Sequence, residues 1–136
     1  MSNEIVVFEN CYLDKNNIKK TIRYLSQQIL RNLKINNSYI EIYVVGSRKI
    51  NAMKKKFLRS NKPATVLSFQ ATNFPHPQTK NRPLGEIYLN KNIFNDNVWP
   101  KFLIHGILHL LGYDHHKKND IIKMENLENK LWDKIS

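Results

Sequence analysis

The sequence predicts an α+β fold in which helices cover a small, mixed four-stranded sheet. Segments rich in β-branched and aromatic residues alternate with segments whose apolar residues recur every three or four positions. The chain has 136 residues, 41% of them hydrophobic, with no internal repeat and no Pro/Gly/Ser-rich linker. That length and composition indicate one domain spanning residues 1–136.

Four segments are predicted to be strands because they are short and rich in β-branched and aromatic residues. They cover residues 4–9, 39–45, 65–69 and 85–90. Residues 70–84 between the last two carry several prolines among polar residues, which indicates a long exposed loop. Together with the helices, the predicted order is βαβαββαα.

The helices are predicted from apolar stripes at residues 15–34, 48–59, 99–111 and 119–134. Ser47 is the expected N-cap of the second helix, which should bury Ile50, Met53 and Phe57. The third helix is apolar nearly all round, so we expect it to be the buried central helix. The last is a closing amphipathic helix.

The charge of the chain favours a polyanionic partner. Lys and Arg number 22 against 11 Asp and Glu, giving a formal net charge of +11. Such an excess attracts phosphate backbones, although a basic overall composition without a nucleic-acid partner would look the same. Lys54, Lys55, Lys56 and Arg59 lie on the exposed side of the second helix and are the candidate nucleic-acid-binding residues.

Cysteine usage and hydropathy exclude other classes. Cys11 is the single cysteine, so an internal disulfide and a multi-cysteine zinc site are excluded. The first residues lack the basic and apolar regions of a signal peptide, and no stretch reaches the ~18 apolar residues of a membrane span. We therefore expect a soluble cytoplasmic protein.

Three histidines near the third helix have the spacing of a metal site. His105 and His109 are four residues apart, so they lie on one face of the helix, one turn apart. Gly112 allows a sharp turn where the helix ends, and His115 can return to the same point. Three imidazoles with an open fourth position are typical of catalytic zinc. His116 is the alternative third ligand.

The same spacing occurs in metzincin peptidases, but a key residue differs. Those enzymes carry a glutamate general base directly after the first histidine, and this chain has Gly106 there. The remaining candidates for a base are Asp114, Glu86 or the metal-activated water itself. Asp114 could instead orient an imidazole or stabilise a turn, and His76 is expected to be a solvated loop residue.

Three blocks of the sequence resemble one family. The segment HGILHLLGYDH (105–115) resembles the signature of the YbeY endoribonucleases, the rRNA maturation factors of bacteria. MKKKFLRSNKPATVLSF (53–69) and LGEI (84–87) resemble two further family blocks in the same order. Ala64-Thr65 stands where the family has Thr-Asp, and Glu86 stands where it has Asp.

The resemblance implies a single-strand-specific, zinc-dependent endoribonuclease acting in 16S rRNA 3′-end maturation and ribosome quality control. It implies one zinc ion per chain on His105, His109 and His115, with Arg59 as the positively charged catalytic residue of the cleft. Asp114 is a second catalytic candidate. The implied partners are single-stranded rRNA and the small ribosomal subunit with its assembly factors; DNA and membranes are not expected.

Two other functions fit parts of the sequence. A non-enzymatic ribosome-assembly or RNA-binding factor would hold a structural zinc, which usually has four protein ligands. A metallopeptidase or amidohydrolase would share the histidine spacing but lacks the glutamate base. The coordination of the metal separates these hypotheses.

Overall fold

The elements of the fold follow from a computed structural model that describes residues 2–9, 17–71, 80–114 and 117–136. The predicted α+β class, with a mixed four-stranded sheet and helices, is confirmed. In chain order the elements are β1 (Glu4–Glu9), α1 (Ile18–Asn32), β2 (Ser38–Val45), α2 (Ser47–Leu58), β3 (Val66–Gln70), β4 (Arg82–Asn90), the short 3-10 helix η1 (Lys91–Asn95), α3 (Pro100–Leu110) and α4 (Lys118–Ile135).

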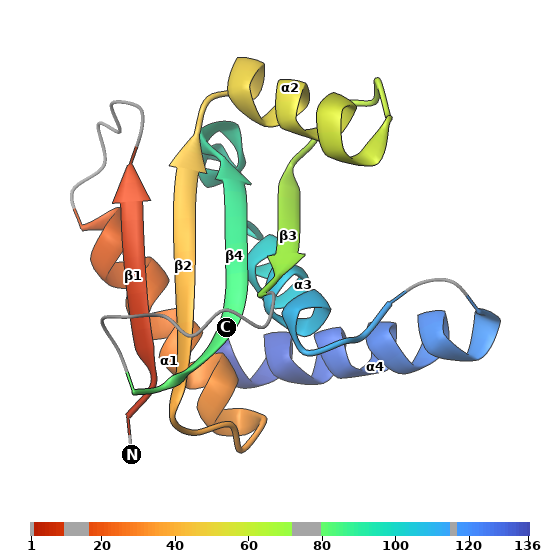
Figure 1. Ribbon diagram of the computed structural model, residues 1–136. Coiled ribbons are helices and arrows are strands. Elements are labelled where there is room, and N and C mark those ends of the chain that lie inside the picture. Colours follow the sequence, from red (N-terminus) through yellow and green to blue (C-terminus); the bar gives the residue numbers. More distant parts are fainter. Residues whose placement is uncertain (1, 10–16, 72–79, 115–116) are drawn as a thin grey trace.

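The sheet has the strand order β1-β2-β4-β3 (Figure 1). β1, β2 and β4 are parallel, whereas β3 pairs with β4 in the antiparallel direction. β3 is therefore an edge strand, and the segment from α2 to β3 brings the chain to that edge. This edge positions the candidate site described below.

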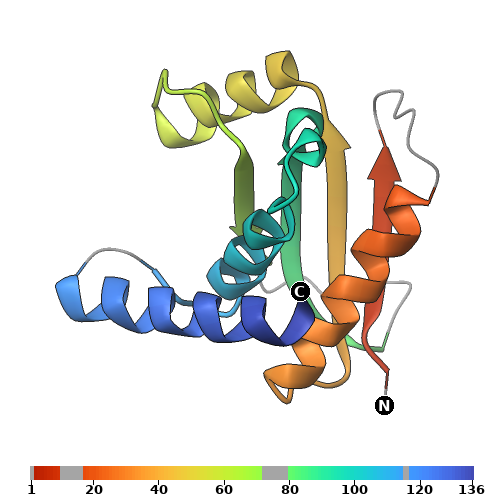
Figure 2. The same ribbon diagram turned by 180° about the vertical axis from the view of Figure 1, so that it is seen from behind.

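Helices are divided unequally between the two faces of the sheet. α1, α3 and α4 lie on one face, as the view from behind shows (Figure 2). α2 lies at the opposite face, near the end of the sheet. The far end of α2 and the first half of α4 both project past the β3 edge, one above the other in Figure 1.

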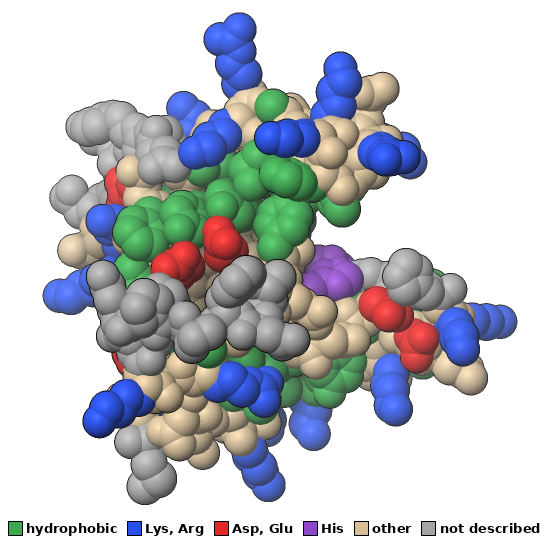
Figure 3. Space-filling model, viewed as in Figure 1, with side chains coloured by type: hydrophobic (Ala, Val, Ile, Leu, Met, Phe, Trp, Pro, Cys, Tyr) green, Lys and Arg blue, Asp and Glu red, His purple; other side chains and the backbone are tan. Residues whose placement is uncertain are grey.

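The face opposite α1 and α3 carries a row of aromatic rings (Figure 3). The rings come from β1, β2, β4, β3 and α2, and we call them the aromatic row: Phe8, Tyr43, Tyr88, Phe69 and Phe57. Neighbouring rings are 4.8 to 5.9 Å apart between centroids. Glu41 lies beside the row and accepts hydrogen bonds from the hydroxyls of Tyr39 and Tyr43. Burial, reinforced by this bond, raises the pKa of Tyr43 to about 12.

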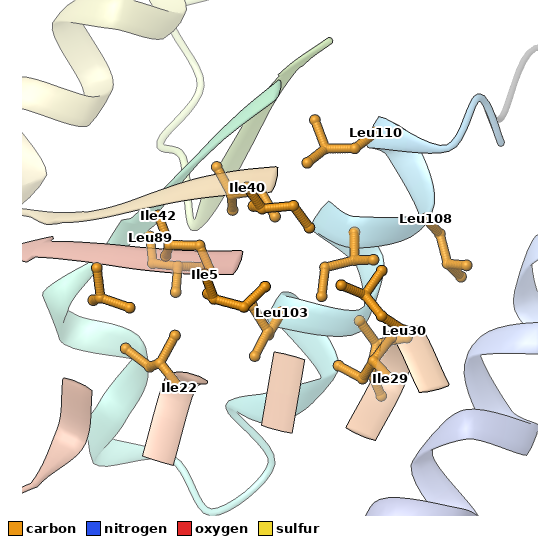
Figure 4. Packing of buried hydrophobic residues seen from close by; sticks show 14 of the residues in the cluster. Ile5, Ile22, Ile29, Leu30, Ile40, Ile42, Leu89, Leu103, Leu108 and Leu110 are labelled. Carbon is orange, nitrogen blue, oxygen red and sulfur yellow. The ribbon is translucent and has the colours of Figure 1, made fainter. Parts of the chain in front are cut away.

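The main core lies between the sheet and the helices α1 and α3 (Figure 4). Alternate residues of β1, β2 and β4 point to this side, as the period of two in a strand requires. Leu103 of α3 is fully buried between sheet and helix layers. The prediction that residues 99–111 form the buried central helix is confirmed, since six of its residues are buried: Leu103, Ile104, Gly106, Ile107, Leu108 and Leu110.

The predicted burial of α2 is wrong in part. Ile50 is fully buried, but Phe57 is 56% exposed. α2 packs on the sheet through Ile50 and Met53 of its first turns. Its last turn extends past the β3 edge and meets the sheet where the Phe57 ring contacts Phe69. Ser47 is likewise not the N-cap; it is the first helical residue, and its Oγ atom accepts a hydrogen bond from Asn90.

The predicted loop 70–84 is shorter than expected. β4 already begins at Arg82, so Pro83 lies within a strand, opposite the position where the β2–β4 register shifts. A proline is tolerated there because the local pairing is irregular. Among the described residues, no helix is long and apolar enough to cross a membrane.

Candidate active site

The helix α3 is held against the edge strand by side chains of β3. Ser68 Oγ donates to the carbonyl of Gly106 at 3.0 Å. The Nε2 amide of Gln70 donates to the carbonyls of His109 and Leu110 at 3.3 and 3.4 Å. The two bonds from Gln70 reach carbonyls of the last turn of the helix, which have no partner within the helix. They also fix the last turn of α3 beside β3.

Gly112 ends this helix as the sequence predicts. Its φ of +99° is a conformation that residues with a Cβ atom rarely adopt. The amide of Gly112 donates to the carbonyl of His109, and that of Tyr113 donates to the carbonyl of Leu108. The chain therefore turns back directly after the two helical histidines.

His105 and His109 lie together on α3, as their spacing predicts. Their Nε2 atoms are 2.9 Å apart, and the rings stand at 74° to each other. Both side chains are half-buried. Two ring nitrogens that bind one zinc ion at its usual bond lengths are about 3.3 Å apart. The donor pair therefore fits a shared metal ion with a small adjustment.

Glu128 of α4 contacts the other side of the first imidazole. Its Oε1 atom lies 3.3 Å from Nδ1 of His105. A carboxylate at this nitrogen favours the tautomer with a proton on Nδ1, in which Nε2 of His105 accepts the hydrogen bond from His109; a metal ion would replace that bond. Glu128 is not among the site residues predicted from the sequence. The sequence feature that could have indicated it is a carboxylate at helical spacing between Met124 and Leu131, the two buried residues of α4.

The third predicted ligand, His115, lies outside the described residues, as do its alternative His116, the loop residue His76 and Cys11. Within the described ranges, no three metal-ligating side chains converge on one point. The structure thus brings together two of the three predicted ligands. The complete ligand set stays a prediction.

A pocket of about 380 Å³ opens beside His109. Its walls come from β3 and from the turn after α3; they comprise Ser68, Phe69, Gln70, His109, Gly112, Tyr113 and Asp114. In Figure 3 the histidine side chains lie in the notch between the projecting ends of α2 and α4. Asp114 also lines a second, smaller pocket of about 190 Å³. The pocket therefore has room for a small ligand next to the two imidazoles.

Gly106 lies where a side chain would crowd the sheet. A Cβ atom there would lie 3.1 Å from Ile87, 3.2 Å from Ser68 Oγ and 3.3 Å from Val66. Such contacts are tighter than ordinary van der Waals separation, and a whole carboxylate side chain would have to enter the sheet. The residue after His105 therefore faces the sheet and packs α3 closely against it.

The other candidate base, Glu86, lies on the face of the sheet opposite α3, beside its register partner Phe69. Ile87 points into the core toward α3, so Glu86 points to the opposite face, where it accepts a hydrogen bond from Tyr88 at 2.7 Å. Glu86 does not line the pocket beside His109, and its role as a base stays a prediction. Asp114 is the described carboxylate that lines the pocket with His109.

The predicted basic residues lie at the end of α2. Lys55, Lys56 and Arg59 are exposed, whereas Lys54 is half-buried and its Nζ atom lies 3.4 Å from the carbonyl of Pro63. Arg59 follows the helix with φ of +52° and ψ of +36°, the left-handed region. In Figure 3 blue side chains gather on α2, above the notch that holds the histidines.

Comparisons with known proteins agree on one family. A family model described as Endoribonuclease YbeY matches residues 6–136. The protein named Endoribonuclease YbeY from Buchnera aphidicola (subsp. Acyrthosiphon pisum) is 34% identical, over 96% of this chain and 90% of its own. A protein of the same name from Sulfurihydrogenibium is 30% identical, over 98% and 93%.

A solved structure supports the fold. The solution structure of a Thermotoga maritima protein has a TM-score of 0.54 with this chain at 21% identity. The match covers 96% of this chain and 90% of the other. At that identity the likeness establishes the shared arrangement of helices and strands.

Proposed function

Because the chain belongs to the YbeY endoribonuclease family, we propose that it is a zinc-dependent enzyme cleaving single-stranded RNA. Cleavage of RNA follows from the family. We further propose that the enzyme acts in the cytoplasm, in 16S rRNA 3′-end maturation and ribosome quality control. Its partners there would be the small ribosomal subunit and the assembly factors of that subunit. The observation that carries the proposal is the pair of Nε2 atoms 2.9 Å apart beside an open pocket.

The histidines are the proposed metal ligands. His105 and His109 would hold zinc through Nε2, with His115 as the third ligand after the turn at Gly112. When bound, zinc supplies Lewis acidity to the phosphodiester. Glu128 holds the ring of His105 in the orientation and tautomer that metal binding needs. Asp114, at the pocket wall, is the proposed group that accepts or holds a proton there.

Basic residues at the end of α2 are the proposed RNA contacts. Lys55 and Lys56 would neutralise backbone phosphates, and Lys54 is the lesser contributor because it is half-buried. Arg59 would bind one phosphate through its planar guanidinium, which can donate two parallel hydrogen bonds to phosphate oxygens. The net charge of +11 supports a polyanionic substrate.

The peptidase alternative is disfavoured by the packing of Gly106. Peptide hydrolysis at this spacing uses a glutamate after the first histidine, and this chain has Gly106 there, where a Cβ atom would crowd side chains of β3 and β4. The open pocket beside His109 favours an enzyme over a factor with a purely structural zinc, because a structural site closes its fourth position.

The direct test is cleavage of a labelled single-stranded RNA by the zinc-loaded protein, with the same sequence annealed to its complement as the matched control. We expect cleavage of the single strand and little of the duplex. Binding should also weaken steeply with added salt, because each neutralised phosphate releases counterions. Full zinc occupancy without any RNA cleavage would contradict the enzymatic proposal and favour the assembly factor.

Loss of the Glu128 carboxylate should weaken zinc binding without removing a ligand. We expect Glu128→Ala to lower the zinc affinity about 10- to 100-fold, because the carboxylate orients the His105 ring. Competition with a chromophoric chelator measures this affinity independently of activity. The matched control is Glu125→Ala, an exposed carboxylate on the same helix; equal affinities of the two variants would refute the role of Glu128.

A further inference from the structure

The ring of Phe57 is unusually exposed for a large apolar side chain on a helix that packs against a sheet. Phe57 is 56% exposed and its neighbour Leu58 is 55% exposed. Two adjacent large apolar side chains in water forgo the stabilisation that burial would give. They lie in the last turn of α2, the end of the helix that projects past the β3 edge in Figure 1.

Phe57 adjoins the candidate active site through one other ring. Its centroid is 5.6 Å from that of Phe69, with the planes at 71°. Phe69 in turn lines the pocket that contains His109. The two rings therefore form an aromatic corner at the mouth of this pocket, and we call Phe57 and Phe69 the aromatic corner.

The rest of the aromatic row offers less ring surface to a ligand. Phe8, Tyr43 and Tyr88 stack on each other, with centroids 4.8 Å apart and planes within 17°. The faces between them are consequently occupied by neighbouring rings. The aromatic corner differs because its rings meet edge to face and Phe57 is half exposed, so a planar group can approach a ring face there.

The charges around the aromatic corner identify the kind of planar group. Lys56 Nζ lies 5.3 Å from the centre of the Phe57 ring, and Lys55 and Arg59 are exposed in the same turn or just beyond it. Aromatic rings beside a positive strip are typical of sites for single-stranded nucleic acid. Lysines are depleted in the cores of protein–protein interfaces, which disfavours a protein partner at this position.

We propose that the aromatic corner is a stacking subsite for one unpaired base of the RNA substrate, next to the phosphate that enters the pocket of His109. This subsite rests on the proposed function and explains its strand preference, because bases within a duplex have both faces covered by their neighbours. Stacking tolerates every base, since each has an aromatic face. The subsite therefore selects single strands without selecting a sequence.

Binding of a non-cleavable RNA tests the subsite. The probe is a short oligoadenylate with 2′-O-methyl riboses, measured by fluorescence anisotropy with the zinc-loaded protein. We expect Phe57→Ala to weaken binding about tenfold, and Phe57→Trp to restore it. The matched control is Tyr24→Ala, which removes a 63% exposed aromatic residue of α1 and should leave binding unchanged.

Two further measurements separate stacking from charge. The loss in Phe57→Ala should be the same factor at every salt concentration, because a base stack releases no counterion. A series of probes, each with one abasic nucleotide at a different position, locates the stacked base. At that position there is no base to stack on Phe57, so wild type and Phe57→Ala should bind equally well.

If wild type and Phe57→Ala bind the oligoadenylate and all its abasic versions equally well, the subsite is refuted. The proposed cleavage of RNA would be unaffected by that result. Failure of the wild-type protein to bind the probe or to cleave RNA would overturn the proposed function as well. A loss in Phe57→Ala that is shared by Tyr24→Ala would also overturn the subsite. So would an equal loss with the same oligoadenylate annealed to its complement.

Discussion

Substitution of His109 by alanine is expected to abolish zinc binding and RNA cleavage together. Wild-type protein should retain about one zinc ion per chain, and the variant none, because a single imidazole on α3 would remain to hold the ion. Metal analysis of the purified proteins measures this content. Cleavage of single-stranded RNA by the variant should fall to the background rate.

The same substitution has a thermodynamic readout. A ligand present at a thousand times its dissociation constant stabilises the folded state by about 4 kcal/mol. Zinc should therefore raise the melting temperature of the wild-type protein by about 10 °C or more, and that of His109→Ala hardly at all. Asp114→Asn is the comparison, since it alters a pocket residue outside the proposed ligand set and should keep its zinc. Zinc retained in full by His109→Ala would refute the site.

The local part of the site was predictable from sequence. A separation of four residues places His105 and His109 on one helical face whatever the tertiary structure. The end of the helix was equally local, because Gly112 adopts a positive φ that other residues avoid. Such features depend on neighbours in the chain, and so the sequence pattern describes them directly.

Features that depend on packing between distant elements were not predictable. Glu128 reaches His105 across 23 positions of sequence, and its role exists only because α4 crosses α3. The exposure of Phe57 had a similar cause. Periodicity gave the correct face of α2, but the helix extends past the edge of the sheet, so the last apolar residue on that face has little to cover it.

Arg59 combines an unfavourable backbone with a proposed catalytic use. Its left-handed conformation at the end of α2 costs about 1–2 kcal/mol for a residue with a Cβ atom, and glycine is the usual residue there. Strained residues concentrate at functional sites. Within the described part of the chain Arg59 makes no ion pair, so a phosphate would not have to displace an internal partner.

Arg59→Lys is therefore expected to lower the single-turnover rate of RNA cleavage about 10²- to 10³-fold, as loss of one preorganised transition-state contact does. Lysine keeps the charge but lacks the planar fork. Lys55→Ala, which removes an exposed charge from the same helix, should instead weaken RNA binding modestly and leave the rate at saturation nearly unchanged.

Arg59→Gly separates catalysis from stability. It should lose activity as Arg59→Lys does, yet its melting temperature should stay the same or rise, because glycine relieves the left-handed backbone. Zinc content should stay at the wild-type level in all three variants. Equal and small effects of Arg59→Lys and Lys55→Ala on the cleavage rate would show that Arg59 acts as one charge among several, and the transition-state contact would then have to come from another residue of the notch.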